Sequence, residues 1–416
     1  MRRSSGWCWS TCSEAEMQRS ADDPNGAKRR PLVAVILDAS RPYDRLIIGG
    51  VASFAREQTS WCLYVEEDPL QKLPDLASWH GDGIIANFDD RRVAAAIRGL
   101  NLPIVGVGGG YGWYDPASGI PYVYTDNAEI AQQAAAHLLA CGFDQFAYYG
   151  CPRTRTTGWS EERGETFEIA CRQAGKPCEV FVGRHRTPRR WEALQQELAD
   201  WLIGLPKPVG LMACNDARAR YVLEACRLAG LKVPDDVAVI GVDNDEMICE
   251  LTDPPLSSVD QAARRVGYEA ARLLAGGLTG GRKPPPLRTV VPPVGVVTRA
   301  STDTMATSDE TVVQVLRSLR ADPRQKPDVE ALAGQACISR STLEKRFRGV
   351  VGRSIHQEHI RLKLAVVRQM IADTGLPLKT VASRCGFSSV QYMTSFLSRH
   401  LGATPARLRQ EERARE

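Results

Sequence analysis

This sequence of 416 residues lacks the features that mark membrane proteins, metal-binding modules and many enzymes. No apolar run approaches the roughly 20 residues that a transmembrane helix needs, so we expect no membrane partner. The twelve cysteines form no CxxC pair and no Cys/His run with zinc spacing, and Cys8 and Cys12 are the closest two. Walker loops, nucleophile elbows and HExxH motifs are absent as well. We therefore expect no metal, no cofactor and no catalytic residues.

A strong charge of one sign is also missing, because 53 Lys and Arg against 49 Asp and Glu leave a net charge of only +4. The excess of basic residues lies at the C-terminal end, from residue 308 to residue 416, whereas the rest of the chain is mildly acidic. This asymmetry favours a polyanion as the partner of the C-terminal end. The length predicts two or three domains, and a hydrophobic content of 43% is enough for sizeable cores.

The first 30 residues contain Arg2 and Arg3 but no continuous apolar segment of the kind that a signal peptide needs. We therefore predict that residues 1–30 form a disordered extension and that the protein is cytoplasmic. Cysteines such as Cys214 and Cys226 stand inside apolar stretches, which predicts buried, reduced thiols.

Strands and helices are predicted to alternate along the body of the chain. The continuous apolar run over residues 31–37 is typical of a strand buried on both faces, and an amphipathic helical pattern follows it. Similar pairs recur, with a helix over Asn127–Ala140 and a strand over Val237–Val242, while Gly276–Pro286 is predicted to be a loop. This alternation predicts an α/β fold with parallel sheets, and the number of units favours two Rossmann-like lobes. We assign residues 31–302 to this domain.

From Glu310 onward every predicted element is a helix, so residues 308–416 form a second, all-α domain. A short helix beginning near Asp328 is followed by a break, and Ser339 is placed to cap the next helix. The apolar side chains of this second helix face a small core, which leaves its polar side chains in solvent. A polar helix of this kind fits the major groove of DNA. The predicted DNA-binding residues here are Arg340, Ser341, Thr342, Lys345 and Arg346.

The same pattern returns near the C-terminus, where a helix opens at Leu378, turns at Cys385-Gly386-Phe387 and is followed by a second candidate recognition helix. A long helix over His356–Ala372 separates the two units and would fix their spacing. The predicted DNA-binding residues of the second unit are Ser388, Ser389, Gln391, Tyr392, Ser395 and Arg399.

These C-terminal residues carry a resemblance to a known family. The sequence Val381-Ala382-x-x-Cys385-Gly386-Phe387, followed by Tyr392-x-x-x-Phe396 and Gly402-x-Thr404-Pro405, resembles the signature of AraC/XylS-type transcription regulators. The match covers about the last 100 residues. It implies two helix-turn-helix units, double-stranded operator DNA and RNA polymerase as partners.

The body resembles the periplasmic-binding-protein-like sensor of lactose-repressor-type regulators. The resemblance rests on two apolar strands that end in polar clusters, Cys214–Ala219 and Val239–Asp245. It implies a two-lobed sugar sensor that also forms the homodimer interface. The combination with an AraC-type end is similar to the xylose operon regulators (XylR), in which it implies a D-xylose-dependent activator. Further segments that carry this similarity are Tyr43–Arg45, Glu66–Asp68, Gly81–Asp90, Pro103–Gly109 and Asp216–Arg220.

A pentose needs polar side chains for its hydroxyl groups and an apolar ring for its C–H face. Helix capping remains open as the alternative role of Asp243, Asp44 and Asp216, and side-chain packing as that of any single aromatic, Tyr111 and Trp159 among them. The predicted ligand-binding residues are Asp243, Asn244, Arg163, Asn215, Asp216, Asp44, Arg45 and Trp113.

Two other classes of protein compete with this interpretation. An enzyme would use the acidic residues Asp38, Asp44, Glu66, Glu67, Asp68, Asp89 and Asp90 as a metal or acid–base cluster. A sugar-binding protein for transport would need export, which the lack of a predicted signal peptide and the DNA-binding end disfavour.

Overall fold

The computed structural model describes residues 29–65, 79–97, 99–109, 118–154, 157–184, 191–280, 288–304, 309–373 and 376–408. The chain divides into two compact units, residues 1–303 and residues 304–416. Each unit has its own cores, and the two are treated separately below.

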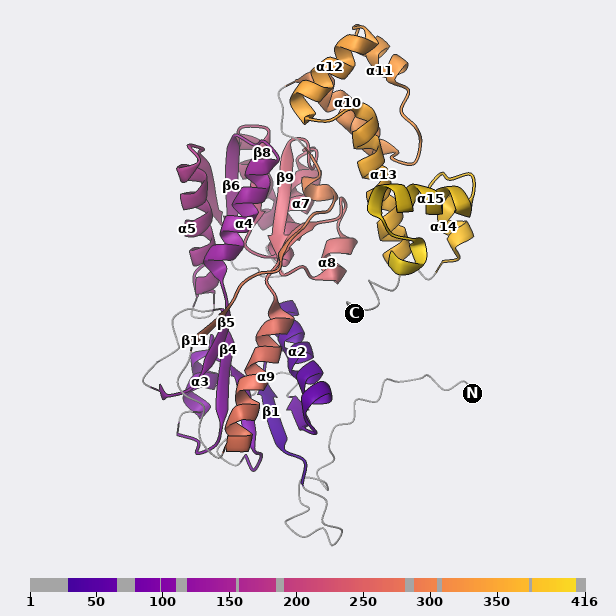
Figure 1. The fold of residues 1–416 in the computed structure, drawn as a ribbon. Coiled ribbons are helices and arrows are strands. Elements are labelled where there is room, and N and C mark those ends of the chain that lie inside the picture. The colour runs from indigo at the N-terminus through magenta and orange to yellow at the C-terminus, as the bar shows by residue number, and fades with distance from the viewer. Residues whose placement is uncertain are drawn as a thin grey trace, which may run out of the picture. The chain divides into compact units, whose positions relative to one another are not determined.

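The first unit contains two six-stranded sheets, each at the centre of one lobe (Figure 1). In lobe A the strands follow the order β11-β5-β4-β3-β1-β2, and all neighbours are parallel. Helices α2 (Pro42–Gln58) and α9 (Ala263–Gly280) pack on one face of this sheet, and α3 (Arg91–Ile97) packs on the other. The strands of lobe A are β1 (Leu32–Ile36), β2 (Cys62–Val65), β3 (Gly83–Asn87), β4 (Ile104–Gly108), β5 (Tyr122–Thr125) and β11 (Arg288–Val291).

Lobe B has the strand order β12-β10-β9-β8-β6-β7, in which only the pairing of β12 with β10 is antiparallel. Its strands are β6 (Gln145–Gly150), β7 (Cys178–Val182), β8 (Val209–Ala213), β9 (Val237–Val242), β10 (Ser257–Asp260) and β12 (Gly295–Val297). Its helices are α4 (Asn127–Ala140), α5 (Gly158–Gln173), α6 (Trp191–Gly204), α7 (Asp216–Leu228) and α8 (Glu246–Leu251), and a short 3-10 helix, η4 (Ala300–Thr302), follows β12.

The chain passes between the lobes three times, from β5 to α4, from β10 to α9 and from β11 to β12. The first two passages touch, because the Thr125 hydroxyl donates to the carbonyl oxygen of Gln261 over 3.2 Å. These passages form the hinge of the unit. Residues that follow the carboxyl ends of strands in both lobes therefore meet near the hinge.

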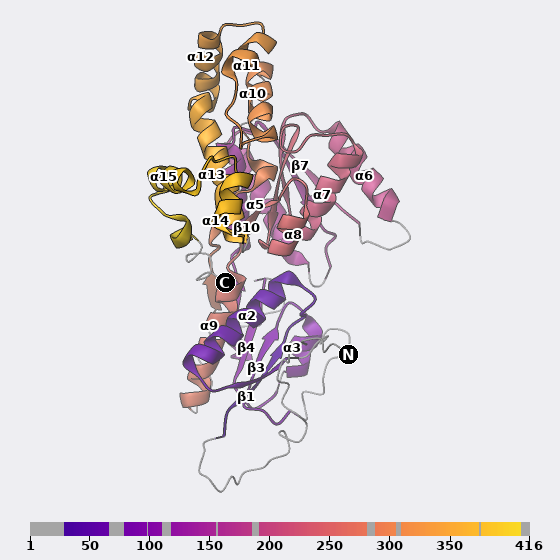
Figure 2. The ribbon, with the colours of Figure 1, turned by 90° about the vertical axis from the view of Figure 1, so that its right-hand side faces the viewer.

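Within its described residues, the second unit contains six helices that pack around two small cores (Figure 2). One core lies at the α10–α12 end of the long helix α13, and the other lies at the α14–α15 end. The helices are α10 (Glu310–Ala321), α11 (Val329–Gln335), α12 (Arg340–Val351), α13 (Ile355–Asp373), α14 (Leu378–Arg384) and α15 (Val390–Leu401).

The predicted fold class is confirmed: two lobes with largely parallel sheets precede an all-α domain. The predicted loop at Gly276–Pro286 is wrong at its start, because α9 continues to Gly280 and buries an apolar face that includes Leu274 and Leu278. None of the helices within the described residues is both long and apolar enough to cross a membrane. Every cysteine in this part of the chain is a free thiol, and Cys337 alone among them is exposed.

Helices α2 and α9 approach each other so closely that glycine is required at the contact. A Cβ atom on Gly267 would lie 2.0 Å from the carbonyl oxygen of Ile47, and one on Gly50 would lie 1.9 Å from that of Arg264. We expect Gly267→Ala to lower the free energy of unfolding by about 1–3 kcal/mol or more, because two backbones must separate. Urea denaturation measures this difference.

Gly276→Ala is the matched control, because a Cβ atom there meets no other atom within 4 Å on the same helix. It should be neutral or stabilising by up to about 1 kcal/mol, since alanine favours a helix more than glycine does. Equal stability of the two variants would contradict the close approach of α2 and α9.

Candidate functional site

A buried arginine stands at the centre of the hinge. Arg163, on the second turn of α5, is only 3% exposed. Its Nε donates to Asn127 Oδ1 over 3.0 Å, and its two terminal nitrogens donate to the Cys214 carbonyl oxygen and to Gln261 Oε1 over 2.8 Å each. Its guanidinium carbon lies 4.8 Å from the centre of the Trp159 ring. The charge is therefore fixed in position by residues at the starts of α4 and α7 and at the end of β10.

The loop after β9 reaches the same centre. Asp243 and Asn244 have φ angles of 120° and 52°, a combination that non-glycine residues rarely adopt and that often marks functional sites. The side-chain amide of Gln261 donates to Asp243 Oδ1, which joins this loop to Arg163. Burial raises the pKa of Asp243 well above its usual value.

Lobe A contributes two buried carboxyl groups and a tyrosine. Asp44 accepts the backbone N–H of Asp38 over 3.1 Å, and Asp89 accepts that of Gly109 over 2.8 Å. Burial raises the pKa of Asp44 to about 6 and that of Asp89 to about 7. The Tyr43 hydroxyl donates to the Gly108 carbonyl oxygen over 3.0 Å.

The two lobes meet at this place, because Arg45 of lobe A lies 3.7 Å from Asp245 of lobe B and the Asn127 side chain donates to the Gly109 carbonyl oxygen. The pKa of Tyr43 is raised by its burial and by the nearby carboxyl groups of Asp89, Asp44 and Asp243, while Arg163 opposes the shift. We call Tyr43, Asp44, Asp89, Arg163 and Asp243 the cleft cluster. It contains hydrogen-bond donors and acceptors, with the Trp159 ring beside Arg163, which suits a compact ligand with several hydroxyl groups.

No group of three or more His, Cys, Asp or Glu side chains within the described residues is placed to hold a metal ion. Glu66, Glu67 and Asp68 of the proposed acidic cluster lie outside the described residues. Asp90 instead pairs with Arg92 at 2.7 Å, and Asp38 pairs with Arg41 at 3.1 Å.

In the second unit, the two candidate recognition helices begin in the same way. Ser339 caps α12 by accepting the N–H of Thr342, and Ser389 caps α15 by accepting the N–H of Tyr392. Each helix buries one apolar stripe and exposes a polar one. Exposed on α12 are Arg340, Ser341, Thr342, Lys345 and Arg346, and exposed at or on α15 are Ser388, Gln391, Tyr392, Ser395 and Arg399, with Ser389 half-buried.

The two helices differ in how their cations are held. Arg340 donates to Glu344 over 3.0 Å and to Glu330 over 3.1 Å, and Arg346 pairs with Asp309. For α15, by contrast, no ion pair to an acidic side chain occurs in the part of the chain that the structure describes. A base or phosphate contact by Arg340 would therefore compete with its two glutamates.

Comparison with known proteins supports the predicted classes of both the sensor and the helical C-terminal unit. Family models described as an XylR N-terminal domain, a periplasmic binding protein-like domain and a helix-turn-helix domain match residues 32–128, 135–302 and 332–411. The xylose operon regulatory protein of Escherichia coli K12 is 35% identical over 92% of this chain and 97% of its own length. This chain belongs to the family of xylose operon regulatory proteins. The corresponding protein of Haemophilus influenzae is 32% identical over 91% of this chain and 97% of its own length.

A solved structure supports the same family. The structure of the xylose-binding transcription activator xylR is 34% identical, covers 92% of this chain and 99% of its own, and superposes with a TM-score of 0.72. The resemblance stated from the sequence motifs is thus confirmed. As a member of this family, the chain is a sugar-sensing transcription regulator.

The ligand-binding residues predicted from the sequence fall into three groups: those in or next to the cleft cluster, one outside the described residues, and three that contact other parts of the sensor. Arg163, Asp243 and Asp44 belong to the cleft cluster, and Asn244 lies in the same loop, where its Oδ1 accepts from Arg299 over 2.9 Å. Trp113 lies outside the described residues.

Three other predicted residues contact other parts of the sensor, two of them over long distances along the chain. Asn215 caps α7, and Arg45 donates to the carbonyl oxygens of Ala39 and Ser40 and lies 3.7 Å from Asp245. Asp216 is fully buried and accepts from the Ser258 hydroxyl over 2.6 Å and the Asp245 N–H over 2.9 Å. Through these contacts Asp216 holds the 243–245 loop in place.

Sequence reasoning did not select Tyr43, Asp89, Asn127 or Gln261 for the site. The sequence indicates Asp89 only as part of an acidic cluster, because its partner Gly109 lies 20 residues further along the chain. Gln261 follows β10, a strand that contains Ser257 and Ser258 instead of an apolar run and was not predicted. The polar residue directly after each buried strand is the signal that points to such positions.

The pKa of Asp89 sets a pH dependence of stability. Because the usual value of 3.8 is raised to about 7 by burial, the folded protein binds this proton more tightly than the unfolded chain does. The resulting contribution to stability is complete below about pH 4 and is lost as the pH rises to about 7. We expect Asp89→Asn to make this decline shallower, by up to about 1.4 kcal/mol per pH unit, in urea denaturation.

Asp90→Asn is the matched control. Burial alone would raise the pKa of Asp90, but hydrogen bonds from Arg92 hold this pKa below its usual value. The contribution of Asp90 to stability is therefore lost only at lower pH. Asp90→Asn should keep the parent slope between about pH 5 and pH 7. A parent-like slope in Asp89→Asn would contradict the burial of a protonated Asp89.

Proposed function

We propose that D-xylose or a related pentose binds between the lobes at the cleft cluster. The observation that carries this proposal is the hydrogen-bonded set of Arg163, Gln261 and Asp243 at the hinge, which faces two carboxyl groups from lobe A. Sugar hydroxyls would replace part of this internal network, with donors at Arg163 and acceptors at the carboxyl groups. Trp159, held against Arg163, would supply the apolar platform. The relative named a xylose-binding transcription activator supports the identity of the sugar.

A sugar that binds to both lobes stabilises the closed arrangement, because only that arrangement offers both sets of partners. The end of the sensor is well placed to pass this change on. Thr302 hydrogen-bonds with His137 Nε2 at 2.8 Å and with Ser257 Oγ at 2.7 Å, and Ser301 Oγ donates to the Val239 carbonyl. The chain therefore leaves the sensor from a buried, hydrogen-bonded anchor, and this favours transmission to the next unit.

We further propose that the protein is a cytoplasmic homodimer that activates genes for xylose use and contacts RNA polymerase at its operator. Each protomer would insert α12 and α15 into successive major grooves, about 34 Å apart, with α13 as the spacer. Nothing in this proposal requires a catalytic residue or a cofactor.

Replacement of Asp243 tests the sugar site. Asp243→Ala removes the carboxyl group that would accept a hydrogen bond from the sugar. We therefore expect D-xylose affinity, measured by isothermal titration calorimetry, to fall by about 1.5–3 kcal/mol, or roughly 10–150-fold. Asp253→Ala, an exposed position in the same lobe, is the control and should bind as the parent does. Parent-like xylose affinity in Asp243→Ala would refute the assignment of the site.

Base recognition is tested on the two exposed helices. We expect Arg340→Ala and Gln391→Ala to relax sequence preference in DNA-binding assays, because side chains that contact base edges carry specificity, each good contact contributing about 1–3 kcal/mol. Gln335→Ala makes the same truncation on the exposed face of α11 and should leave the preference intact. Equal losses on operator and random DNA for both Arg340→Ala and Gln391→Ala would count against base recognition by α12 and α15.

A further inference from the structure

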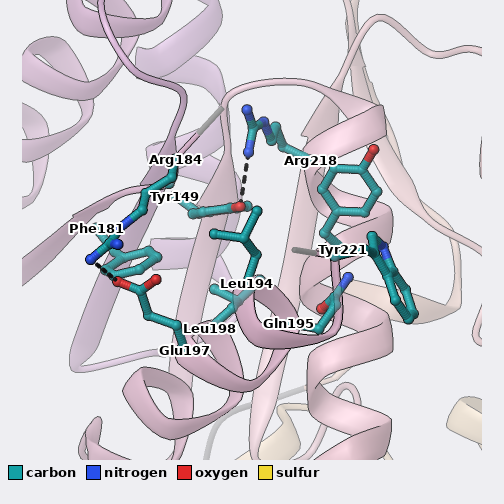
Figure 3. A pocket seen from close by; sticks show the side chains of 11 residues that line it. Tyr149, Phe181, Arg184, Leu194, Gln195, Glu197, Leu198, Arg218 and Tyr221 are labelled. Carbon is teal, nitrogen blue, oxygen red and sulfur yellow. Dashed lines mark hydrogen bonds and ion pairs between the residues drawn. The ribbon is translucent and has the colours of Figure 1, made fainter. Parts of the chain in front are cut away.

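The hollow between α6 and α7 in lobe B has room, within the described residues, for about one water molecule. Tyr149, Arg218 and Tyr221 line it, and Arg218 donates to the Tyr149 hydroxyl over 3.0 Å (Figure 3). A hollow of this size does not suit a second sugar or a larger ligand. The second unit contains a contact of more consequence, near the middle of helix α13.

The two cores of the second unit use separate stretches of α13. Ile355 and Leu362 belong to the core at the α10–α12 end. Val367 and Ile371 belong to the core at the α14–α15 end (Figure 2). Two bodies that share only one helix can move relative to each other as that helix bends, and long helices are rarely straight. A contact away from the helix axis is needed to remove this freedom.

Lys363, at the boundary between these stretches, makes such a contact. Its Nζ donates to the carbonyl oxygen of Arg324 over 2.9 Å and to that of Gly386 over a longer 3.4 Å. It also lies 4.4 Å from the centre of the Phe387 ring. Arg324 is in the segment between α10 and α11, whereas Gly386 and Phe387 are in the turn between α14 and α15. One ammonium group therefore joins the two ends of the unit.

Both carbonyl groups are held by their own turns. Asp322 Oδ1 accepts the backbone N–H of Arg324 over 3.1 Å and its Nε over 2.9 Å. On the other side, the Gly386 N–H donates to the Ser383 carbonyl oxygen over 3.1 Å. The turns also approach each other directly, because a Cβ atom on Gly386 would lie 2.9 Å from the Arg324 carbonyl oxygen. Lys363 thus connects two fixed points.

The donors of Lys363 are directed at the protein itself. The side chain is half-buried, and burial lowers the pKa of its ammonium group below the usual value. A lysine that served only to bind DNA phosphate would keep its donors in solvent. The contacts with two backbone carbonyls and a ring therefore favour a role in holding the unit together.

We propose that Lys363 is a positioning residue that fixes the recognition helices α12 and α15 relative to each other, so that the protein selects operators by the spacing of their two half-sites. This inference rests on the proposed function, in which the two helices enter successive major grooves. One added base pair moves a half-site by about 3.4 Å and turns it by roughly 35° about the DNA axis. A rigid pair of helices cannot follow that change, whereas a pair that moves can.

The test uses an operator duplex that the full-length parent protein selects from random DNA, and the same duplex with one base pair inserted between the half-sites. The measured quantity is the ratio of the two dissociation constants, in which a uniform loss of DNA affinity cancels. In the parent, the insertion should weaken binding about tenfold or more, because the base contacts of one half-site are lost. In Lys363→Met it should weaken binding less than about threefold, because methionine donates no hydrogen bond.

Three further variants accompany this measurement. Lys363→Arg keeps the charge and the donors and should restore the parent ratio. Lys326→Met removes an equal charge from an exposed position in the same segment as Arg324 and should keep the parent ratio. Asp322→Ala releases the Arg324 turn and should lower the ratio, as Lys363→Met does. This last variant keeps the test decisive even where Lys363→Met does not fold.

A parent-like ratio in folded Lys363→Met would overturn the proposal, as would a parent-like ratio in Asp322→Ala if only that variant folds. A parent that tolerates the insertion while its hydroxyl-radical footprint covers both half-sites would also overturn it, since the helices would then not be rigidly spaced. A footprint over one half-site alone would instead overturn the two-groove binding of the proposed function, and this inference with it.

Discussion

The buried guanidinium of Arg163 is the constraint on which the sensor depends. An arginine that is 3% exposed must have partners for its donors, because an unpaired buried charge is strongly destabilising. Its partners come from three places in the chain, Asn127, Cys214 and Gln261, and Gln261 passes the connection to Asp243. One cation therefore joins three segments at the hinge, and a ligand that competes for its donors would change how these segments are held.

One helix connects this centre to the end of the sensor. Helix α4 begins at Asn127, which bonds to Arg163, and carries His137, which bonds to Thr302 just before the second unit begins. A rigid helix with a hydrogen bond at each end can transmit a shift at the hinge to the anchor of the next domain. This continuity gives sugar control of DNA binding a physical route.

The sequence predicted those parts of the structure that depend on local pattern. The strand near residues 32–36, helix α4, the helix start near Asp328 and the cap at Ser339 each follow from neighbouring residues. The site was less predictable, because its members meet through long-range contacts. Asp89 and Gln261 become visible only when β4 and β10 are in place, and β10 carries serines whose hydroxyl groups bond to Arg299 and Asp216. Arg163 could be predicted as a ligand-binding residue, because it lies near the start of the helix that follows β6.

We propose that sugar and operator DNA bind to the same closed arrangement, so that each changes the affinity of the protein for the other. Linkage requires that xylose change operator affinity by the same factor by which operator changes xylose affinity. We expect each ligand to change the affinity for the other by a factor of about 5–150, equivalent to about 1–3 kcal/mol. The decisive measurement is xylose affinity by calorimetry with and without saturating operator, paired with operator affinity with and without saturating xylose. Two equal factors within this range would support the account, and two affinities each indifferent to the other ligand would contradict it.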